Sequence, residues 1–402
     1  MADSIQRLDS IDSSGFPLGF KVARGTARPG VIGDTASSDV FRVELRAMGG
    51  HQKEAVVTEG SQGSVFRGVS DEGTALTGTD LAPNPLSFFA AALPADIMSR
   101  FVQIARARGV SVEGLSSEQV YFYGFEGSFM RGDGKGSALA PQVNLRLRSG
   151  APAATLGEIA RTALAASPLA ALCRTPLDNT FALYANGRRR AFGSPTPSSA
   201  PDAPDPLKTW KGAPSPLDTA KDFPGMVSKL GSAPAAAAPA PAPQADPQAT
   251  VRRSIRIEGA TTWKDKVTES EIRGGGSRFG FKSDERMDGA GAPCALSIGA
   301  WGIAFCLTTQ FLRYADFHKM KIRAVRMVQT SPFELAGSAA AGTLRAIAHP
   351  LDTHIFLHGE ESDQRMEKLL VMAQNTCYLH ALLAAPLEPV LELEVNGAPV
   401  PI

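Results

Sequence analysis

The chain of 402 residues is longer than a typical single domain, and its 43% of hydrophobic residues can fill one or two sizeable cores. Its 41 lysines and arginines balance 40 aspartates and glutamates to a formal charge of +1. No overall field therefore favours nucleic acid or an anionic membrane surface as a partner. The four cysteines are too few and too scattered for a disulfide scaffold, and none stands at zinc-ligand spacing, so we expect neither structural disulfides nor a metal site.

The first part of the chain predicts little regular structure apart from GFPLGFKVARG at 15–25. Residues 1–37 begin MADSIQRLDSIDSS, which mixes charges with small polar residues and lacks the apolar stretch of a signal peptide. The longest apolar run of the chain, LSIGAWGIAFCL at 296–307, is shorter than the roughly 18 residues that a membrane-spanning helix needs. We therefore expect a cytoplasmic protein with no membrane partner and a weakly structured N-terminal segment.

Residues 38–192 predict an α+β domain. Alternating segments such as VFRVELRA come first, a long apolar helix is expected at 86–108, strands such as QVNLRLRSG follow, and a second helix at 155–173 precedes a closing strand. This order predicts long helices packed on mostly antiparallel sheets. The composition changes at 193–250, where Pro, Ala and Ser dominate, as is typical of an extended linker.

Residues 251–402 repeat the first domain, with helices expected at 295–317 and 362–383. ALCRTPLDNTFALYANG at 171–187 and ALLAAPLEPVLELEVNG at 381–397 agree at seven positions without a gap. The same offset of 210 residues matches Phe101 with Phe311, Ala105 with Ala315, and Val57-Thr58-Glu59 with Val267-Thr268-Glu269. One offset shared by distant segments indicates an internal duplication. Because each copy alone would expose a long apolar helix, we expect the copies to pack as one pseudo-symmetric unit, with protease access to the linker at 232–248.

The offset also relates the cysteines to residues of the first copy. Cys306 corresponds to Asp96, and Cys377 corresponds to Ser167, so only the second copy has thiols at these two positions. A single cysteine in an apolar helix usually packs as a small hydrophobe, and two cysteines at matched positions weaken that interpretation. Asp96 is expected to be exposed, bound to a cation, or part of an altered site, because an unpaired buried carboxylate is costly.

Two pairs of segments resemble a known family. NPLSFFAAALPADIMSRF in the first copy, and APCALSIGAWGIAFCLTTQFLRYA with NTCYLHALLAAPLEP in the second, resemble the signature helices of the OsmC/Ohr family, the osmotically inducible protein C and organic hydroperoxide resistance proteins. In that family a helix that opens on Asn-Pro carries an attacking cysteine, and a later helix carries a second one. The resemblance covers nearly all of both domains and none of the linker.

The resemblance implies two OsmC-like domains that form an intramolecular pseudo-dimer, with further oligomerisation left open, and a thiol peroxidase that uses no cofactor. Cys306 corresponds to the thiol that attacks an organic hydroperoxide or another apolar substrate. Cys377 corresponds to the resolving thiol, and the resulting disulfide would be reduced again by a dithiol partner. The first copy, with Asp96 and Ser167 in place of the thiols, would then shape the single remaining site.

The resemblance also implies supporting residues. A thiolate in an apolar pocket needs a nearby cation. Arg286 stands where the family has its arginine, although a solvated loop charge is an equal alternative. Trp301 and Phe305 would line the pocket unless they only pack in the core. His380 follows Cys377 by three residues and could transfer protons, or could be an ordinary histidine of the core or surface.

The chain departs from the family pattern at three positions. Family members often have a glutamate after the helix-opening proline, where this chain has Leu86 and Cys294, and the proline expected after the second cysteine is Tyr378. Two other functions therefore stay open. One is a cysteine-dependent sulfur or acyl transfer, for which Cys306 is essential and Cys377 is dispensable. The other is a non-catalytic binding or redox-sensing module, which would keep its ligand affinity without Cys306.

Overall fold

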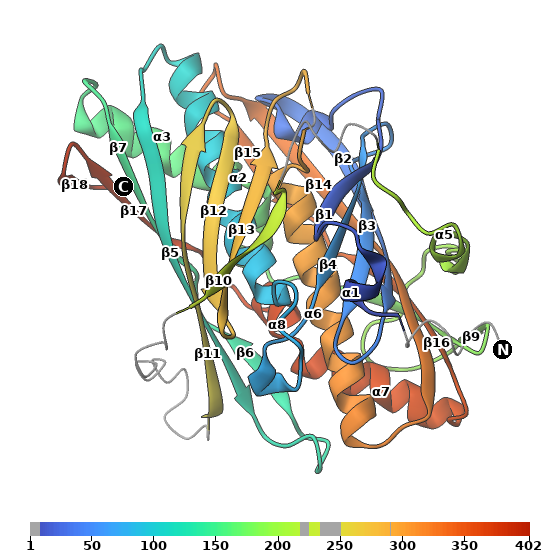
Figure 1. Cartoon of the computed structure of the whole chain (residues 1–402). Helices are drawn as coiled ribbons and strands as arrows, with labels where there is room; N and C mark the ends of the chain where they lie inside the picture. Colours follow the sequence, from blue (N-terminus) through green and yellow to red (C-terminus); the bar gives the residue numbers. More distant parts are fainter. Residues whose placement is uncertain (1–8, 218–224, 234–250, 290) are drawn as a thin grey trace.

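The computed structural model describes residues 9–217, 225–233, 251–289 and 291–402. Two β-sheets enclose two long helices, α2 (Pro85–Ala107) and α6 (Ala295–Phe317), which pack against each other in the centre (Figure 1). The predicted α+β class and the two central helices are confirmed.

Each sheet has nine strands among the described residues. The first sheet contains, in spatial order, β1 (Gly19–Ala23), β4 (Val65–Ser70), β3 (Lys53–Thr58), β2 (Thr35–Ala47), β14 (Ile322–Ser338), β16 (Asp352–Gly359), β8 (Thr180–Ala185) and β9 (Arg188–Arg190), with β15 (Arg345–Ala348) beside β14. The second contains β10 (Val227–Ser232), β13 (Ser277–Asp284), β12 (Val267–Gly274), β11 (Val251–Lys264), β5 (Glu113–Glu126), β7 (Gln142–Arg148), β17 (Val390–Val395) and β18 (Ala398–Val400), with β6 (Lys135–Ala138) beside β5.

The two copies exchange strands. In the first sheet β2 of the first copy pairs with β14 of the second, and in the second sheet β11 of the second copy pairs with β5 of the first. Both sheets therefore contain strands from both copies. The sequence predicted mostly antiparallel sheets, and each sheet has one parallel pair, β16 with β8 and β17 with β7. These pairs are parallel because helices carry the chain from one sheet to the other, where it joins a strand of the other copy.

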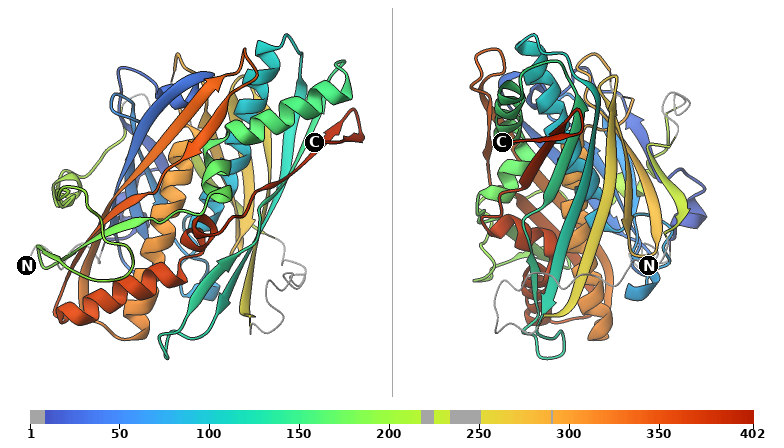
Figure 2. Two further views of the ribbon diagram at one scale, coloured as in Figure 1. Left: turned by 180° about the vertical axis from the view of Figure 1, so that it is seen from behind. Right: turned by 90° about the vertical axis from the view of Figure 1, so that its left-hand side faces the viewer.

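Shorter helices cover the central pair. Seen from behind, α3 and α7 lie across the back of α2 and α6 (Figure 2). The helices other than α2 and α6 are α1 (Ile11–Ser14), α3 (Ala153–Ala166), α4 (Pro168–Arg174), α5 (Leu207–Lys211), α7 (Asp363–Thr376) and α8 (Tyr378–Ala384), with 3-10 turns at η2 (Gly30–Ile32) and η3 (Thr74–Leu76).

The duplication is visible in the element boundaries. Six elements of the first copy, α2, β6, α3, α4, β8 and β9, recur 210 residues later as α6, β15, α7, α8, β17 and β18 with identical lengths. The offset does not hold in the first hairpins. Val57 pairs with Phe66 near the end of β3, whereas Val267 pairs with Asp284 at the start of β12. The Val-Thr-Glu match is therefore fortuitous, and the repeated Ser70-Asp71-Glu72 and Ser283-Asp284-Glu285 mark the equivalent ends of β4 and β13.

The N-terminal segment and the predicted linker each contribute one edge strand. β1 lies within the predicted N-terminal segment 1–37 and pairs with β4, and β10 lies within the predicted linker 193–250 and pairs with β13. The linker also contains α5, whose Trp210 is buried. Both strands are short and add to an existing sheet edge, so their sequences carry only a weak strand pattern. The predicted protease access at 232–248 falls almost wholly on residues outside those described.

Close packing of the central helices depends on a glycine. A Cβ atom on Gly302 of α6 would lie 3.1 Å from the Phe89 nitrogen and 3.1 Å from the Pro85 oxygen, both in the first turn of α2. Asn84 caps this turn, because its side chain accepts a hydrogen bond from the Ser87 nitrogen, and Pro85 has the favoured first helical position. Gly302 thus lets the start of α2 lie directly on α6.

Both central helices are long and apolar enough to cross a membrane by length and composition. Their most apolar windows are 89% buried in α2 and 100% buried in α6 inside the protein. Such burial is what the core helices of a folded domain show.

Candidate functional site

A pocket of about 230 Å³ opens beside Cys306, at the junction of the two copies. The second copy contributes the C-terminal half of α6, the start of β11 and the first residue of α8, and the first copy contributes the start of α2 and the loop after β4. The residues that line the pocket include Glu72, Leu86, Arg253, Cys306, Arg313 and Tyr378. Neither copy alone could form this pocket.

The two predicted cysteines lie together. Cys306 lines the pocket and is 2% exposed, whereas Cys377 is fully buried between α7 and α8. Burial raises the pKa of the Cys377 thiol well above its usual range, and the neighbouring Cys306 raises it further. All four cysteines of the chain are free thiols.

The matched positions of the first copy, Asp96 and Ser167, are also close together. The Ser167 hydroxyl donates a hydrogen bond of 2.6 Å to Asp96, which also accepts the backbone N–H of Leu169 at 3.0 Å. Asp96 forms an ion pair of 3.4 Å with Arg100, one helical turn away. Of the three alternatives for Asp96, the structure shows binding to a cation. In the first copy the side chains at these two positions are thus in direct contact, and both cap the start of α4.

His380 contacts the buried thiol. Its Nδ1 lies 3.2 Å from the Cys377 sulfur, and its ring packs on Phe181 of the first copy. Burial lowers the pKa of His380 to about 4, so the imidazole is neutral at neutral pH. The Nδ1 of a neutral imidazole can accept a hydrogen bond from the Cys377 thiol, which agrees with the predicted position beside Cys377, but so weak a base does not take the proton of a thiol whose own pKa is raised.

A carboxylate enters the pocket from the first copy. Glu72 Oε1 accepts hydrogen bonds from the Thr309 hydroxyl at 2.6 Å and from the Lys53 ammonium at 3.3 Å. The equivalent carboxylate, Glu285, accepts the backbone N–H of Ala295 at 2.8 Å on the other side of the molecule. Burial raises the pKa of Glu285 to about 7, and Asp96 is near enough to raise it further. Cys306 on α6 therefore has Glu72 of the first copy nearby, and Asp96 on α2 has Glu285 of the second copy nearby.

Arg286 does not lie at Cys306, which corrects the prediction. Its guanidinium donates two hydrogen bonds to Asp284, at 2.8 Å and 2.6 Å. The physical reason is the exchange between copies, because the loop after β13 faces the Asp96 side and the loop after β4 reaches Cys306. The cations of the pocket are Arg253 of β11 and Arg313 of α6.

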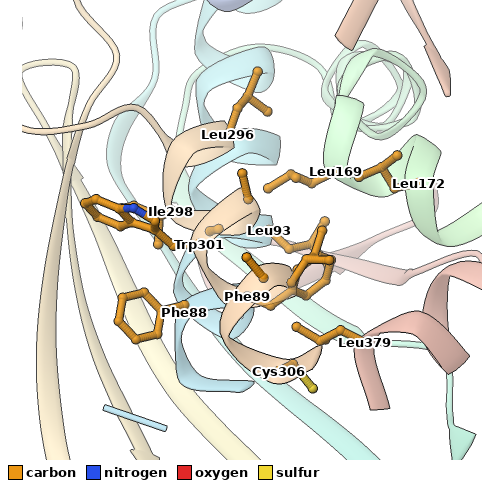
Figure 3. Packing of buried hydrophobic residues seen from close by; sticks show 14 of the residues in the cluster. Phe88, Phe89, Leu93, Leu169, Leu172, Leu296, Ile298, Trp301, Cys306 and Leu379 are labelled. Carbon is orange, nitrogen blue, oxygen red and sulfur yellow. The ribbon is translucent and has the colours of Figure 1, made fainter. Parts of the chain in front are cut away.

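Trp301 and Phe305 do not line the pocket, which corrects the second prediction. Their rings pack on Phe88 of α2, with centroids 6.3 Å and 5.2 Å away. Figure 3 shows Trp301 and Phe88 on one flank of α6 and Cys306 on the side of α8. Trp301 and Phe305 are four residues apart, so both lie on the face of α6 that contacts α2. Successive residues of a helix are turned by about 100°, so Cys306 points in a different direction from Phe305.

Sequence reasoning missed Glu72, Lys53, Arg253 and Arg313. The repeated tripeptide Ser-Asp-Glu, at 70–72 and 283–285, is the signal that could have identified Glu72 as one of an equivalent pair. Arg313 follows Cys306 by seven residues, which is two turns of α6, so helical periodicity could have identified it. No pattern in the sequence marks Arg253, because strand β11 is positioned by its pairing with β5 of the other copy. Within the described residues, no group of three or more His, Cys, Asp or Glu side chains could hold a metal ion.

Comparisons with known proteins give one partial likeness. No protein-family model matches the chain, and no curated protein matches it. Among solved structures, an OsmC-like hydroperoxide resistance protein from Jannaschia sp. CCS1 is similar over 35% of this chain and 93% of that chain, at 19% identity and a TM-score of 0.26. The likeness is low and covers part of the chain.

Proposed function

We propose that the protein is a thiol peroxidase that reduces organic hydroperoxides, with Cys306 as the attacking thiol and Cys377 as the resolving thiol. The observation that carries the proposal is the unequal access of two neighbouring thiols. Cys306 lines the pocket, whereas Cys377 is fully buried beside it. A substrate can reach the first sulfur, and the second sulfur can be reached only from within.

The proposed reaction consumes a hydroperoxide as the oxidant and a dithiol as the reductant. The Cys306 thiolate attacks the terminal oxygen of the hydroperoxide, an S–O bond forms, the O–O bond breaks, and the departing alkoxide takes up a proton to leave as an alcohol. The Cys377 thiol then attacks the sulfenic acid, which forms the disulfide and releases water. A dithiol reductant restores both thiols by disulfide exchange.

The lining of the pocket supports an organic substrate. The apolar residues Leu76, Leu86 and Ile257 line the pocket, and Arg253 and Arg313 add positive charge. Cations near a cysteine favour the thiolate, which is the reactive form. A volume of about 230 Å³ lies below the usual range of about 300–1,000 Å³ for drug-sized ligands, so a small hydroperoxide such as cumene hydroperoxide suits the pocket.

The test is disulfide formation on treatment with cumene hydroperoxide. We expect one equivalent to produce a Cys306–Cys377 disulfide, identified by mass spectrometry of non-reduced peptides. Cys306→Ser should abolish peroxide consumption, because no other thiol lines the pocket within the described residues. Cys377→Ser should allow one turnover and leave a sulfenic acid on Cys306 that dimedone traps. Cys173→Ser, at a thiol outside the lining, serves as the matched control and should retain full turnover. An unmodified Cys306 after excess peroxide would contradict the proposal.

A sulfur or acyl transfer at Cys306 is the second candidate, and one observation favours it. Leu86 lines the pocket at the position where OsmC/Ohr proteins often have a glutamate, so the site lacks that carboxylate. The Cys377→Ser variant separates the two candidates, because a transfer reaction needs Cys306 alone and would retain full multiple turnover. A binding module would retain its ligand in Cys306→Ser.

A further inference from the structure

Two tyrosines of β5 have buried hydroxyls that the proposed chemistry does not use. Tyr121 is 1% exposed and Tyr123 is 2% exposed, and neither hydroxyl has a hydrogen-bond partner among the described residues. Residues two apart on a strand share a face, so both side chains point into the core. A buried polar group without a partner costs about 1–3 kcal/mol, and its presence calls for an explanation.

Tyr123 lies against the segment that holds the thiols. Its ring contacts the ring of Tyr378, with centroids 5.9 Å apart, and Tyr378 both follows Cys377 and lines the Cys306 pocket. Gly136 of the adjoining strand β6 packs on the backbone of Cys377, so the β5–β6 hairpin lies directly under the junction of α7 and α8.

The electrostatic surroundings of the two phenols differ. Burial raises the pKa of Tyr123 well above its usual range, and both Cys306 and Cys377 are near enough to raise it further. Burial also raises the pKa of Tyr121. Cys173 raises the pKa of both tyrosines, whereas Cys306 and Cys377 act only on Tyr123. Both phenols stay protonated at neutral pH and can therefore donate a hydrogen bond, but Tyr123 alone of the two has the site thiols as neighbours.

The duplication provides an internal comparison. Tyr123 pairs with Ala138 of β6, and Phe333 pairs with Ala348 of β15 in the same register. Phe333 packs on Phe41, with ring centroids 5.2 Å apart, on the side of the molecule where Asp96 replaces the attacking cysteine. A phenylalanine therefore fits this place in the fold, and the hydroxyl occurs only in the copy of the site that has thiols.

We propose that the Tyr123 hydroxyl is the hydrogen-bond donor of the thiol site, directed at the Cys306 thiolate and, once peroxide has reacted, at the oxygen that sulfur has gained. The second half of this inference depends on the proposed peroxidase function, and the first half does not. The hydroxyl lacks a partner in the resting fold because its acceptor is the charged or oxidised sulfur.

The experiment compares Tyr123→Phe with the matched control Tyr121→Phe, which removes a buried, unpaired hydroxyl from the same strand. The first measurement is the rate of Cys306 alkylation by iodoacetamide against pH, without peroxide. We expect Tyr123→Phe to shift the profile to higher pH and to slow alkylation at pH 7 by about tenfold, the effect of one lost hydrogen bond to a charged group. Tyr121→Phe should leave the profile unchanged. A Tyr123→Phe profile that superimposes on the parent profile would overturn the proposal.

A second measurement follows the oxidised sulfur in the Cys377→Ser background. After cumene hydroperoxide, we expect Tyr123→Phe to lower the yield of the dimedone adduct of Cys306 by about tenfold relative to Tyr121→Phe. If no variant forms a sulfenic acid but the alkylation shift is present, the peroxidase proposal fails and the donor role stands. Thermal unfolding provides the structural check, because loss of a hydroxyl without a folded-state partner should not lower Tm. A Tm drop in Tyr123→Phe well beyond that of Tyr121→Phe would indicate a structural bond and overturn the inference.

Discussion

At the scale of single residues, the two copies have different side chains at two matched positions of the fold. Asp96 and Ser167 form a hydrogen bond of 2.6 Å that caps α4, and Cys306 and Cys377 occupy the matched positions in the other copy. The guanidinium of Arg100 also donates to the carbonyl of Gly33 at 2.6 Å, so the N-terminal segment covers this side of α2. The first copy therefore has a hydrogen-bonded structural pair at the two positions where the second copy has thiols.

The buried carboxyl of Glu285 gives a prediction about pH. Its folded-state pKa of about 7 lies above the ordinary value of 4.5, so the folded state holds its proton over a range where the unfolded state releases it. The stabilisation is complete below pH 4.5 and is lost as the pH rises through 7. We expect the parent protein to lose up to roughly 3 kcal/mol of unfolding free energy from this group between pH 4.5 and 8. Glu285→Gln keeps the acceptor for Ala295 and should flatten this slope.

Urea unfolding at pH 5 and pH 8 measures the effect. The exposed Glu113→Gln serves as the control for a change of charge alone, and its slope should equal that of the parent. Equal slopes in Glu285→Gln and the parent would show that Glu285 ionises normally in the folded protein.

At the scale of elements, the close contact of α2 and α6 builds the wall of the pocket. Pro85 and Leu86 line the pocket because Gly302 lets the first turn of α2 approach α6. Gly302→Val would place new atoms against backbone atoms that lie 3.1 Å from the added Cβ. We expect a loss of about 1–3 kcal/mol in unfolding free energy and a changed rate of Cys306 alkylation, because the start of α2 must move.

Chemical denaturation and alkylation kinetics test this packing argument. Gly150→Val is the control, since a Cβ atom there meets no atom within 4 Å. A Gly302→Val protein with parental stability and parental alkylation would mean that α2 does not constrain the pocket.

The sequence could predict those helices and strands whose formation depends on neighbouring residues along the chain. The apolar runs and the offset of 210 residues predicted α2, α6 and the positions of Cys306 and Cys377 relative to their counterparts. Arg286 was misplaced because its loop serves the other half of the molecule, and a strand exchange between copies leaves no periodic signal in either copy. Trp301 and Phe305 were assigned to the pocket from their nearness in sequence, although the direction of a side chain on a helix depends on which neighbour the helix faces.

At the scale of the whole molecule, the strand exchange makes each half incomplete. Without the second copy, the first sheet lacks β14 and β16 between β2 and β8, and without the first copy the second sheet lacks β5 and β7 between β11 and β17. Each half alone would expose unpaired strand edges and one face of a long apolar helix. The chain therefore behaves as one cooperative unit although it arose by duplication.

This interdependence predicts how a split chain behaves. Fragments 1–242 and 243–402 should be insoluble when each is produced alone, and should form a soluble 1:1 complex when produced together, because the paired strands β2 with β14 and β11 with β5 bring them together. Co-purification on a tag carried by one fragment measures the association, and the Cys306 alkylation rate reports whether the pocket has reformed. A break between residues 305 and 306, which divides α6, is the control and should not reassemble, since both pieces would leave half of a buried helix unpaired. Two fragments that are each soluble and do not associate would contradict the strand exchange, because each would then have to fold without the strands β2 and β14, or β5 and β11, being paired across the copies.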